Sequence, residues 1–534
     1  MARRAHRLLL ALLIVAVATP ALAQTPKRGG VIRIAEREAV SLDPHLTIEF
    51  LTHSYVSLAY SQLVRFPNGP EQKSTTDFSI VPDLAEKWTV SKDGTVYTFV
   101  LRKGVRFHNK PPVNGREVEA ADVKFSLERF MGKSAYRDRF EPVQSIEAVD
   151  KSTVRITLKE PYAPFLNHLA TPSFCAIFPR EVEAKFKDFN HPDAVIGTGP
   201  FVLKSYDKGV RVVFERNPNY FMKGLPYLDG AAIEITPDAA ARLSLLRAGK
   251  VELPHIWGWI SLEEAKSVQK TNPELMLIRL QTLGQGRIYM RTDQPPFNDV
   301  RVRRAVSLAI NRPAWNEALL FGEGCIDSGP VPCAMKEWKL EAARMDQARA
   351  KYLVGYDPDE ARKLLAEAGY PRGFTTPMFH WPGFSPPWRS YYELAADNLG
   401  KIGITVELRP EEFNKYVSTT ALGKYEKMAM GPSTPFTEVD DFLYARFHSE
   451  LPTNNGHVAD AELDKMLVAQ RREMDPKKRK QIIDDIQRYL AYKAYTVFLP
   501  QSPQYLAHAA HVKGFQHHDG YGLGMRLLYT WLDK

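Results

Sequence analysis

Residues 295–312 read PPFNDVRVRRAVSLAINR, and this stretch predicts an amphipathic helix. With Asn298 or Asp299 as the N-cap, apolar side chains repeat at helical spacing and form a single stripe made of Val302, Ala305, Val306, Ala309 and Ile310. We expect this stripe to face a core. Arg301, Arg303 and Arg304 flank the stripe or lie opposite it, so we expect all three on the outside, where they meet an acidic neighbour or a partner protein. Basic clusters of this kind also occur in nucleic-acid-binding proteins, and the rest of the chain distinguishes the two readings.

Outward from this helix, short β-rich runs alternate with further amphipathic helices. Residues 31–36 (VIRIAE), 152–158 (STVRITL) and 210–216 (VRVVFER) have the composition of strands. The segment AADVKFSLERFM predicts a helix with a cap near Ala121 and Asp122, and PDEARKLLAEAGY predicts one that stops at Gly369. The sequence contains no repeat and no low-complexity tract. It therefore indicates an α/β fold, and the 534 residues are enough for two or three domains.

The first 23 residues have the pattern of a cleavable Sec signal peptide. Three arginines precede an apolar run over residues 8–17, and a small-residue cleavage site ends at Ala23. The run is too short to cross a bilayer, and there is no cysteine at the cleavage site, so we expect a free periplasmic protein without a lipid anchor. Cleavage removes three arginines and no acidic residue, which lowers the formal net charge from +9 to +6. Such a mild excess, without long basic and aromatic tracts, argues against a nucleic-acid partner.

Three cysteines and a group of histidines are candidates for further chemistry. In an oxidising compartment Cys325 and Cys333 could close a small loop, which leaves Cys175 as a buried thiol. The C-terminal segment YLAHAAHVKGFQHHDGYG lacks cysteines and carboxylates at ligand spacing apart from Asp519, so a structural role is favoured over a metal site. Nucleophile-elbow, zincin and P-loop motifs are absent, which argues against an enzyme and gives no reason to expect a cofactor.

Aromatic residues are frequent in sequence typical of loops. HIWGWI contains Trp257 and Trp259, and HWPGFSPPW contains Trp381, Phe384 and Trp388. Aromatic side chains on turns expose apolar surface unless a neighbour or a ligand covers them. We therefore predict that these residues line a ligand cleft, with packing inside the loops as the alternative for each of them.

The order of several motifs makes the chain similar to the family-5 extracellular solute-binding proteins, which serve peptide, nickel and related ABC importers. These motifs are GGVIRIAEREAVSLDPH, VPDLAEKW, VEAADVKFSLER, GTGPFVLKSY, PPFNDVRVRRAVSLAINR and LAADNLGKIGITVEL. The resemblance implies a type II periplasmic-binding-protein fold of the large cluster, with two lobes, a two-segment hinge and an extra subdomain. Ligand binding would stabilise closure because the ligand touches both lobes, and a membrane permease would recognise the closed form. It also implies a monomer that performs no chemistry.

By this resemblance the core of the first lobe is built from residues 24–64, 195–285 and 503–534. The extra subdomain occupies residues 65–194, and the second lobe occupies residues 286–502. This division places PPFNDVRVRRAVSLAINR just after the chain crosses into the second lobe.

Binding residues carry over one position at a time. Glu38 matches an acidic residue of the ligand cavity in oligopeptide-binding relatives, and Tyr136 matches a cavity tyrosine of the subdomain. The aspartate that holds a peptide's α-amino group is replaced by Pro435, and the arginine that grips the carboxylate of dipeptides is replaced by Pro382. An ordinary dipeptide would therefore bury charges without partners, which costs several kcal/mol.

With Phe436 and the loop aromatics nearby, we predict an apolar, aromatic cavity. Its candidate ligands are an oligopeptide, a glycoside, an opine-like compound or another aromatic solute. A metal or haem carrier of the same fold and a secreted hydrolase are the alternatives.

Overall fold

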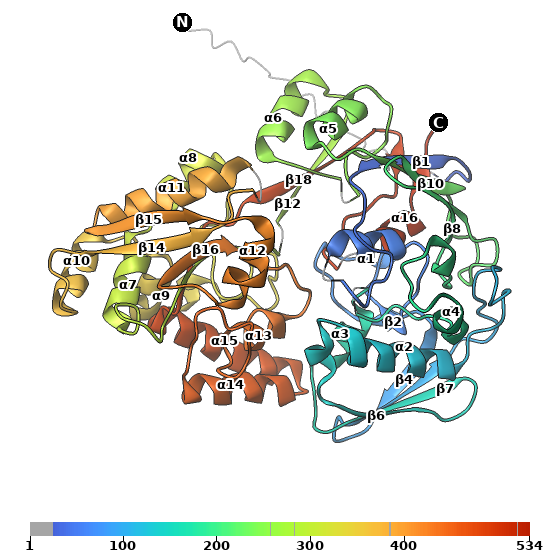
Figure 1. Ribbon diagram of the computed structural model, residues 1–534, viewed down its shortest axis with the longest axis horizontal. Coiled ribbons are helices and arrows are strands. Elements are labelled where there is room, and N and C mark those ends of the chain that lie inside the picture. The colour runs from blue at the N-terminus through green and yellow to red at the C-terminus, as the bar shows by residue number, and fades with distance from the viewer. Residues whose placement is uncertain are drawn as a thin grey trace, which may run out of the picture.

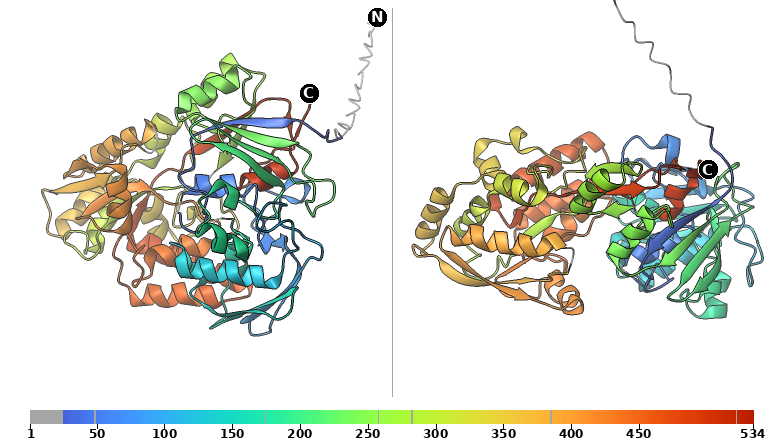
Figure 2. Two further views of the ribbon diagram at one scale, coloured as in Figure 1. Left: turned by 45° about the vertical axis from the view of Figure 1, so that its right-hand side comes forward. Right: turned by 90° about the horizontal axis from the view of Figure 1, so that it is seen from above.

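The computed structural model describes residues 25–47, 49–172, 174–256, 258–281, 283–383, 386–520 and 522–534. The predicted signal peptide lies outside these residues, as do Trp257 and Phe384. The chain forms two large bodies side by side, which Figure 1 and Figure 2 show from three directions. Among the described residues, no helix is long and apolar enough to cross a membrane.

The first lobe is organised around a four-stranded sheet in the order β1-β10-β9-β8. Strand β1 is parallel to β10, and the other neighbouring pairs are antiparallel. Ile32 and Ile34 of β1 are both fully buried, as the alternation of a strand with one face on the core requires. The four strands are β1 (Val31–Glu36), β10 (Gly230–Ile235), β9 (Arg211–Arg216) and β8 (Phe201–Asp207). Two helices of this lobe, α1 (Phe50–Val56) and α16 (Leu523–Leu528), contact each other.

A smaller subdomain adds a second antiparallel sheet below the first lobe in the view of Figure 1, in the order β4-β5-β7-β6. Its strands are β4 (Ala85–Val90), β5 (Val96–Leu101), β7 (Thr153–Leu158) and β6 (Val143–Ala148), and its helices are α2 (Ala120–Lys133), α3 (Phe165–Ala170) and α4 (Arg180–Phe186).

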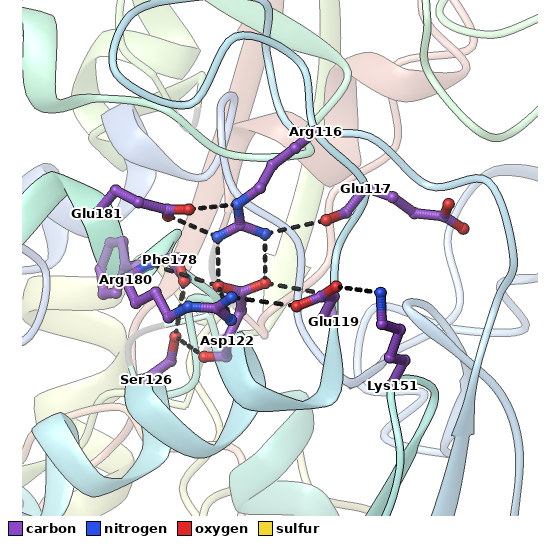
Figure 3. Close-up of polar contacts among 9 residues, drawn as sticks. All are labelled: Arg116, Glu117, Glu119, Asp122, Ser126, Lys151, Phe178, Arg180 and Glu181. Carbon is purple, nitrogen blue, oxygen red and sulfur yellow. Dashed lines mark hydrogen bonds and ion pairs between the residues drawn. The ribbon is translucent and has the colours of Figure 1, made fainter.

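An ion-pair network fixes the start of α2 within this subdomain (Figure 3). The N-cap of α2 is Glu119, two or three residues before the predicted cap, and it forms a reciprocal capping box with Asp122. The guanidinium of Arg116 contacts the fully buried carboxylate of Asp122 at 2.6 Å and also Glu181, the second residue of α4. Because these charges are paired with each other, the network joins α2 to α4 and is a structural feature of the subdomain.

The second lobe contains a five-stranded mixed sheet in the order β15-β14-β16-β13-β17. Its strands are β15 (Ile404–Pro410), β14 (Phe374–His380), β16 (Met428–Pro432), β13 (Gly286–Met290) and β17 (Thr496–Phe498). The helices of this lobe are α7 (Val300–Ala309), α8 (Arg312–Leu320), α9 (Gln347–Val354), α10 (Pro358–Glu367), α11 (Pro386–Gly400), α12 (Phe413–Ser418), α13 (Tyr444–Phe447), α14 (Ala461–Arg472) and α15 (Pro476–Lys493).

Helix α7 is the helix that PPFNDVRVRRAVSLAINR predicts, with Asp299 as its N-cap. All five residues of the apolar stripe are buried. The prediction that the three arginines lie outside is wrong for Arg303, whose residue exposure is only 4%. Its guanidinium donates to the backbone oxygens of Phe297, Asn298 and Lys493, because the C-terminal end of α15 packs against that side of the helix.

Arg301 and Arg304 also contact groups within the lobe. Arg301 pairs with its own N-cap, Asp299, at 2.6 Å. Arg304 lies over the ring of Tyr492 and donates to the backbone oxygen of that residue. The acidic neighbour that we expected for the cluster is therefore Asp299.

Two segments connect the lobes, and a disulfide loop is attached to both of them. The antiparallel strands β12 (Met276–Gln281) and β18 (Pro503–His508) lie between the lobes in Figure 1, where the chain enters the second lobe and later leaves it. Cys325 and Cys333 form a disulfide, and Cys325 exchanges two backbone hydrogen bonds with Gln501 on one connecting segment. The Gln501 side chain accepts from the Cys333 amide and donates to the backbone oxygen of Gly284 on the other segment. Cys175 is a buried thiol.

Shorter elements complete the described part of the chain. They are β2 (Val64–Arg65), β3 (Val81–Pro82), β11 (Trp259–Ile260), β19 (Val512–Lys513), β20 (Trp531–Leu532), α5 (Ala239–Arg247) and α6 (Leu262–Thr271), together with six 3-10 turns, η1 (Gly69–Glu71), η2 (Arg137–Phe140), η3 (Pro192–Ala194), η4 (Ala342–Arg344), η5 (Thr420–Leu422) and η6 (Val439–Asp441).

Candidate functional site

A cavity of about 70 Å³ lies where the connecting segments meet the two lobes. Its walls come from both lobes and from the connection between them, and the lining residues are Trp259, Leu283, Gly284, Pro435, Gln504, Asp519 and Arg526. Trp259, Leu283 and Pro435 make part of the wall apolar, whereas Gln504, Asp519 and Arg526 supply polar and charged groups.

Asp519 is the most informative polar residue of the cavity. It precedes α16 in the first lobe, and its side chain is only 4% exposed. Its Oδ1 accepts a hydrogen bond from His517 Nε2 at 2.9 Å. Its buried Oδ2 has no hydrogen-bond partner among the described residues, and the same is true of Gln504 Oε1. Two acceptors therefore line the cavity without a protein donor, which is costly unless a ligand supplies one.

His517 orients Asp519 without neutralising it. Burial lowers the pKa of His517, and the nearby positive charge of Arg526 lowers it further. At neutral pH the ring is therefore uncharged, and it donates one proton to Oδ1. The Arg526 guanidinium, whose Nη2 donates to the backbone oxygen of His518, places a positive charge on the same wall.

Trp259 is the one predicted aromatic residue that lines this cavity in the described part of the chain. It lies on the short strand β11, which pairs with β18. Its ring stacks on His255 with a centroid distance of 6.3 Å and lies 5.9 Å from the ring of His517. These contacts hold the indole of Trp259 beside the hydrogen-bonded pair of His517 and Asp519.

Below the cavity, the subdomain contacts the second lobe through polar and aromatic side chains. Tyr136 and Phe436, both predicted as ligand-binding residues, meet edge to face across this boundary with their ring centroids 5.9 Å apart. Arg139 pairs with Asp441 at 3.0 Å, and Thr437 Oγ1 donates to Asn167 Oδ1 at 2.8 Å. Tyr136 and Phe436 therefore belong to a lobe-to-lobe contact and are not among the residues that line the cavity.

Glu38, Trp381 and Trp388, which are also predicted ligand residues, are not among the residues that line the cavity. Glu38 Oε1 accepts from the Tyr206 hydroxyl at 2.8 Å and from the Gly209 amide, both within the first lobe. Trp381 follows β14 and packs on Phe413 with a ring distance of 4.5 Å. Trp388 lies in the first turn of α11 and packs against Tyr391 and Tyr392. Trp257 and Phe384 lie outside the described residues.

The side chains of the C-terminal histidines form hydrogen bonds with other protein groups and not with each other. His508 contacts the backbone oxygen of Ala509, His511 contacts Glu252, and His518 contacts the backbone oxygen of Asp77. No cluster of three or more histidine, cysteine, aspartate or glutamate residues with the geometry of a metal site occurs in the part of the chain that the structure describes.

Comparison with known proteins identifies the family. The model of the bacterial extracellular solute-binding proteins, family 5, matches residues 79–453. The chain belongs to this family.

Among relatives of this family-5 protein, the heme-binding protein A of Haemophilus influenzae is 32% identical over 76% of this chain and 74% of the relative. The dipeptide-binding protein of Escherichia coli is 27% identical over 90% of this chain and 91% of its own. The structure of the periplasmic binding protein DppA from Helicobacter pylori, in complex with the peptide STSA, superimposes with a TM-score of 0.79 at 28% identity, and covers 95% of this chain and 99% of its own.

Family membership establishes the fold and the general function. Family-5 proteins have two lobes, bind peptides or other small ligands, and deliver them to the permeases of ABC importers. They are transport components and not an enzyme family. This chain is a solute-binding protein of that class.

Sequence reasoning missed most of the residues that line the cavity. Asp519 was considered only as a possible metal ligand, and Gln504 and Arg526 carry no local motif. Pro435 was noted for the aspartate that it replaces, and the structure shows that it is part of the cavity wall. Charged residues next to glycines near the C-terminus, as in HHDGYGLGMR, are the one local signal that could have drawn attention to this wall.

Proposed function

We propose that this protein captures its solute in the cavity between Trp259 and Pro435, and that the solute is not an ordinary dipeptide. The observation that carries the proposal is the position of Pro435. By the family resemblance this position holds the aspartate that binds a peptide's α-amino group, and here a proline contributes an uncharged wall to the cavity. The side chain of Pro435 offers no partner to a dipeptide ammonium placed against it.

The second peptide clamp is also replaced. Pro382 stands where dipeptide-binding relatives have the arginine for the carboxylate, and it is exposed in the loop before α11. Other solutes do not need charged partners at these two positions. They include an oligopeptide held by its backbone, a glycoside, an opine-like compound or an aromatic solute.

Native mass spectrometry of the protein as purified tests this proposal, because binding proteins that close around a ligand retain it. The expected mass is that of a solute other than a dipeptide with free termini. Thermal unfolding with Ala-Phe, an unmodified dipeptide, should give no stabilisation. A co-purified dipeptide or a clear shift with Ala-Phe would show that the two prolines do not exclude this ligand class.

A haem carrier is the second candidate, because the Haemophilus influenzae relative is named a heme-binding protein. The C-terminal histidines give it little support, since ring nitrogens of His508, His511, His517 and His518 contact protein groups. Titration with haemin, followed by its absorption spectrum, should show no specific complex, and a saturable one-to-one change would favour this candidate instead.

We also propose that this protein is exported to the periplasm and that it delivers its solute to the permease of an ABC importer. The arginines and apolar run of residues 1–23 support Sec export with cleavage after Ala23 and no lipid anchor. The mass of the periplasmic protein should correspond to a chain that begins at Gln24. Retention of the apolar run in the mature protein would contradict cleavage.

A further inference from the structure

Arg287 is a buried arginine of the second lobe that has no acidic partner in the described part of the chain. It lies on β13, which begins two residues after Gly284 of the cavity wall, and it is 1% exposed. Burial lowers the pKa of Arg287 to about 10, so the guanidinium still carries its charge at neutral pH. The neighbours that act on this pKa are Tyr289 and Arg446, and neither is a carboxylate. A buried charge is costly unless a partner neutralises it.

Most N–H groups of the Arg287 guanidinium also lack an acceptor. Nη2 donates to Gln285 Oε1 at 2.7 Å and, at 3.5 Å, to the backbone oxygen of Pro330. Among the described residues, Nε has no acceptor although it is closed to solvent, and Nη1 has none either. Because a guanidinium has five N–H donors, the protein satisfies only a minority of them. The remaining donors are available to an acceptor that the protein does not supply.

A second buried arginine of the same lobe, Arg312, is satisfied by the protein itself. It is also 1% exposed, and it donates to Ser307 Oγ and to the backbone oxygens of Ser307, Phe498 and Gly355. Arg287 neighbours one of these residues, since its Cζ lies 5.3 Å from the centre of the Phe498 ring. Backbone oxygens can therefore satisfy a buried guanidinium in this part of the lobe, and they do so for Arg312 but not for Arg287.

Arg287 is connected to the cavity wall through Gln285. The Gln285 side chain accepts from the guanidinium, and its backbone oxygen accepts from the amide of Ser433. Ser433 Oγ accepts in turn from the Gln285 amide. Ser433 is two residues before Pro435, which lines the cavity together with Gly284. A solute in the cavity therefore lies beside the segments that carry and hold Arg287.

We propose that Arg287 binds an anionic group of the solute, and that the solute carries a carboxylate or a similar acidic group and no ammonium group. Such a group supplies both the missing acceptor and the missing charge. The absence of an ammonium agrees with Pro435, whose side chain offers an ammonium no partner. The proposal rests on the proposed function, because it assumes that the solute occupies this cavity. It favours aromatic and other organic acids and disfavours neutral glycosides.

Thermal unfolding and calorimetry of the mature protein with two matched sets of probes test this proposal. The small set is acetate, acetamide and glycine, and the aromatic set is 3-phenylpropionate, 3-phenylpropionamide and phenylalanine. Each set holds a carboxylate, its neutral amide and a relative that adds an ammonium group. At least one carboxylate should stabilise the protein. Its amide should bind roughly 30-fold more weakly or not at all, because the amide leaves the buried charge unpaired. The ammonium-bearing relative should also bind more weakly than the carboxylate.

Variants separate a binding role of Arg287 from a structural role. Arg287→Met removes the charge and keeps most of the length, so the ligand-free protein should unfold at the same temperature or higher. The same variant should weaken binding of the carboxylate roughly 30-fold or more. Arg287→Lys keeps the charge without the planar fork and should recover part of this loss.

Arg312→Met is the matched control for these variants. It should lower the unfolding temperature, because several buried oxygens lose their donor. The folded variant should bind the carboxylate as the wild type does.

Each outcome decides between the alternatives. Equal binding of a carboxylate and its amide, or equal binding of the carboxylate by the wild type and Arg287→Met, overturns the role of Arg287. If sodium chloride or phosphate stabilises the wild type but not Arg287→Met, and no carboxylate does so, Arg287 binds an inorganic ion and the proposal is wrong. If the ammonium-bearing relative binds as tightly as the carboxylate, the stated ligand class is wrong.

The co-purified solute separates this proposal from the proposed function. If native mass spectrometry finds an uncharged solute and no carboxylate binds, the anionic ligand class is wrong while the proposed solute-binding cavity stands. If no probe binds and no solute co-purifies, the proposed function falls as well.

Discussion

Arg139 and Asp441 form an ion pair across the two lobes, with Arg139 Nη2 3.0 Å from Asp441 Oδ1 and both side chains 7% exposed or less. Arg139 comes from the subdomain of the first lobe and Asp441 from the turn before α13 in the second lobe. The pair exists only while these lobes touch. Opening of the lobes returns both groups to water, so the pair contributes to closure more than to the stability of either lobe.

We therefore predict that Asp441→Asn shifts the protein toward an open form. The lost attraction costs the closed form roughly 1–3 kcal/mol, less than for a fully orphaned charge because Arg139 keeps Asp138 as a partner. Small-angle X-ray scattering of the ligand-free protein should show a larger radius of gyration, and the affinity for the co-purified solute should fall about 10-fold or more.

A matched control lies three residues earlier in the chain. Glu438 pairs with Arg479 of α15, a partner in the same lobe, and both side chains are 6% exposed. Glu438→Gln should lower the free energy of unfolding by about 3 kcal/mol without changing the radius of gyration. If both variants expand the protein equally, or neither does, the Arg139–Asp441 pair has no specific part in closure.

Helix α7 provides a second prediction, because its arginines lie in different environments. Arg303 is buried and donates to three backbone oxygens, whereas the side chain of Arg301 is 42% exposed. Arg303→Gln should destabilise the protein by about 3 kcal/mol, since buried acceptors lose their donors. Arg301→Gln should change stability by no more than about 1 kcal/mol. Urea unfolding of the two variants measures the difference, and similar losses would contradict these assignments.

The same contrast shows what local sequence patterns can predict. The apolar stripe of α7 follows from helical periodicity alone, so its five residues were assigned to the core correctly. The burial of Arg303 depends on Lys493, which is 190 residues away in the chain. Periodicity carries no information about such a neighbour.

In the candidate site, too, some features follow from local sequence and others only from the three-dimensional structure. The motif order identified the family, and Trp259 was assigned to a cleft from its loop sequence. Tyr136 and Phe436 contact each other across the lobes, and each ring covers the other. Their role in ligand binding stays a prediction. Asp519 and Gln504 acquire meaning only from the absence of donors around their oxygens in the described structure, which no local pattern encodes.

The disulfide loop gives a third prediction, which concerns the connection between the lobes. Reduction, or the double change of Cys325 and Cys333 to serine, should lower the free energy of unfolding by roughly 2.5 kcal/mol, the chain-entropy value for a loop of this size. Because Gln501 joins this loop to Gly284, amide hydrogens of both connecting segments should also exchange faster. Cys175→Ala is the control for the cysteine changes, and it should leave that exchange unaltered.

The last prediction concerns acid, and it follows from two buried histidines. His108 Nδ1 accepts from the Gly197 amide while Nε2 faces the Gly199 oxygen, and His518 Nδ1 accepts from the Gly520 amide while Nε2 faces the Asp77 oxygen. Each ring must be neutral to make both contacts. Burial accordingly lowers the pKa of both residues from 6.5 to about 4.

Because the folded pKa lies below the unfolded one, the unfolded chain binds more protons between pH 6.5 and pH 4. The stability contributed by the neutral rings is therefore fully present above pH 6.5 and is lost as the pH falls toward 4, by up to about 1.4 kcal/mol per pH unit for each histidine. Urea unfolding at a series of pH values should show this slope, and His108→Gln should reduce it by about one histidine's share. A slope that is the same in His108→Gln as in the wild type would show that this ring is not held in its neutral form by the fold.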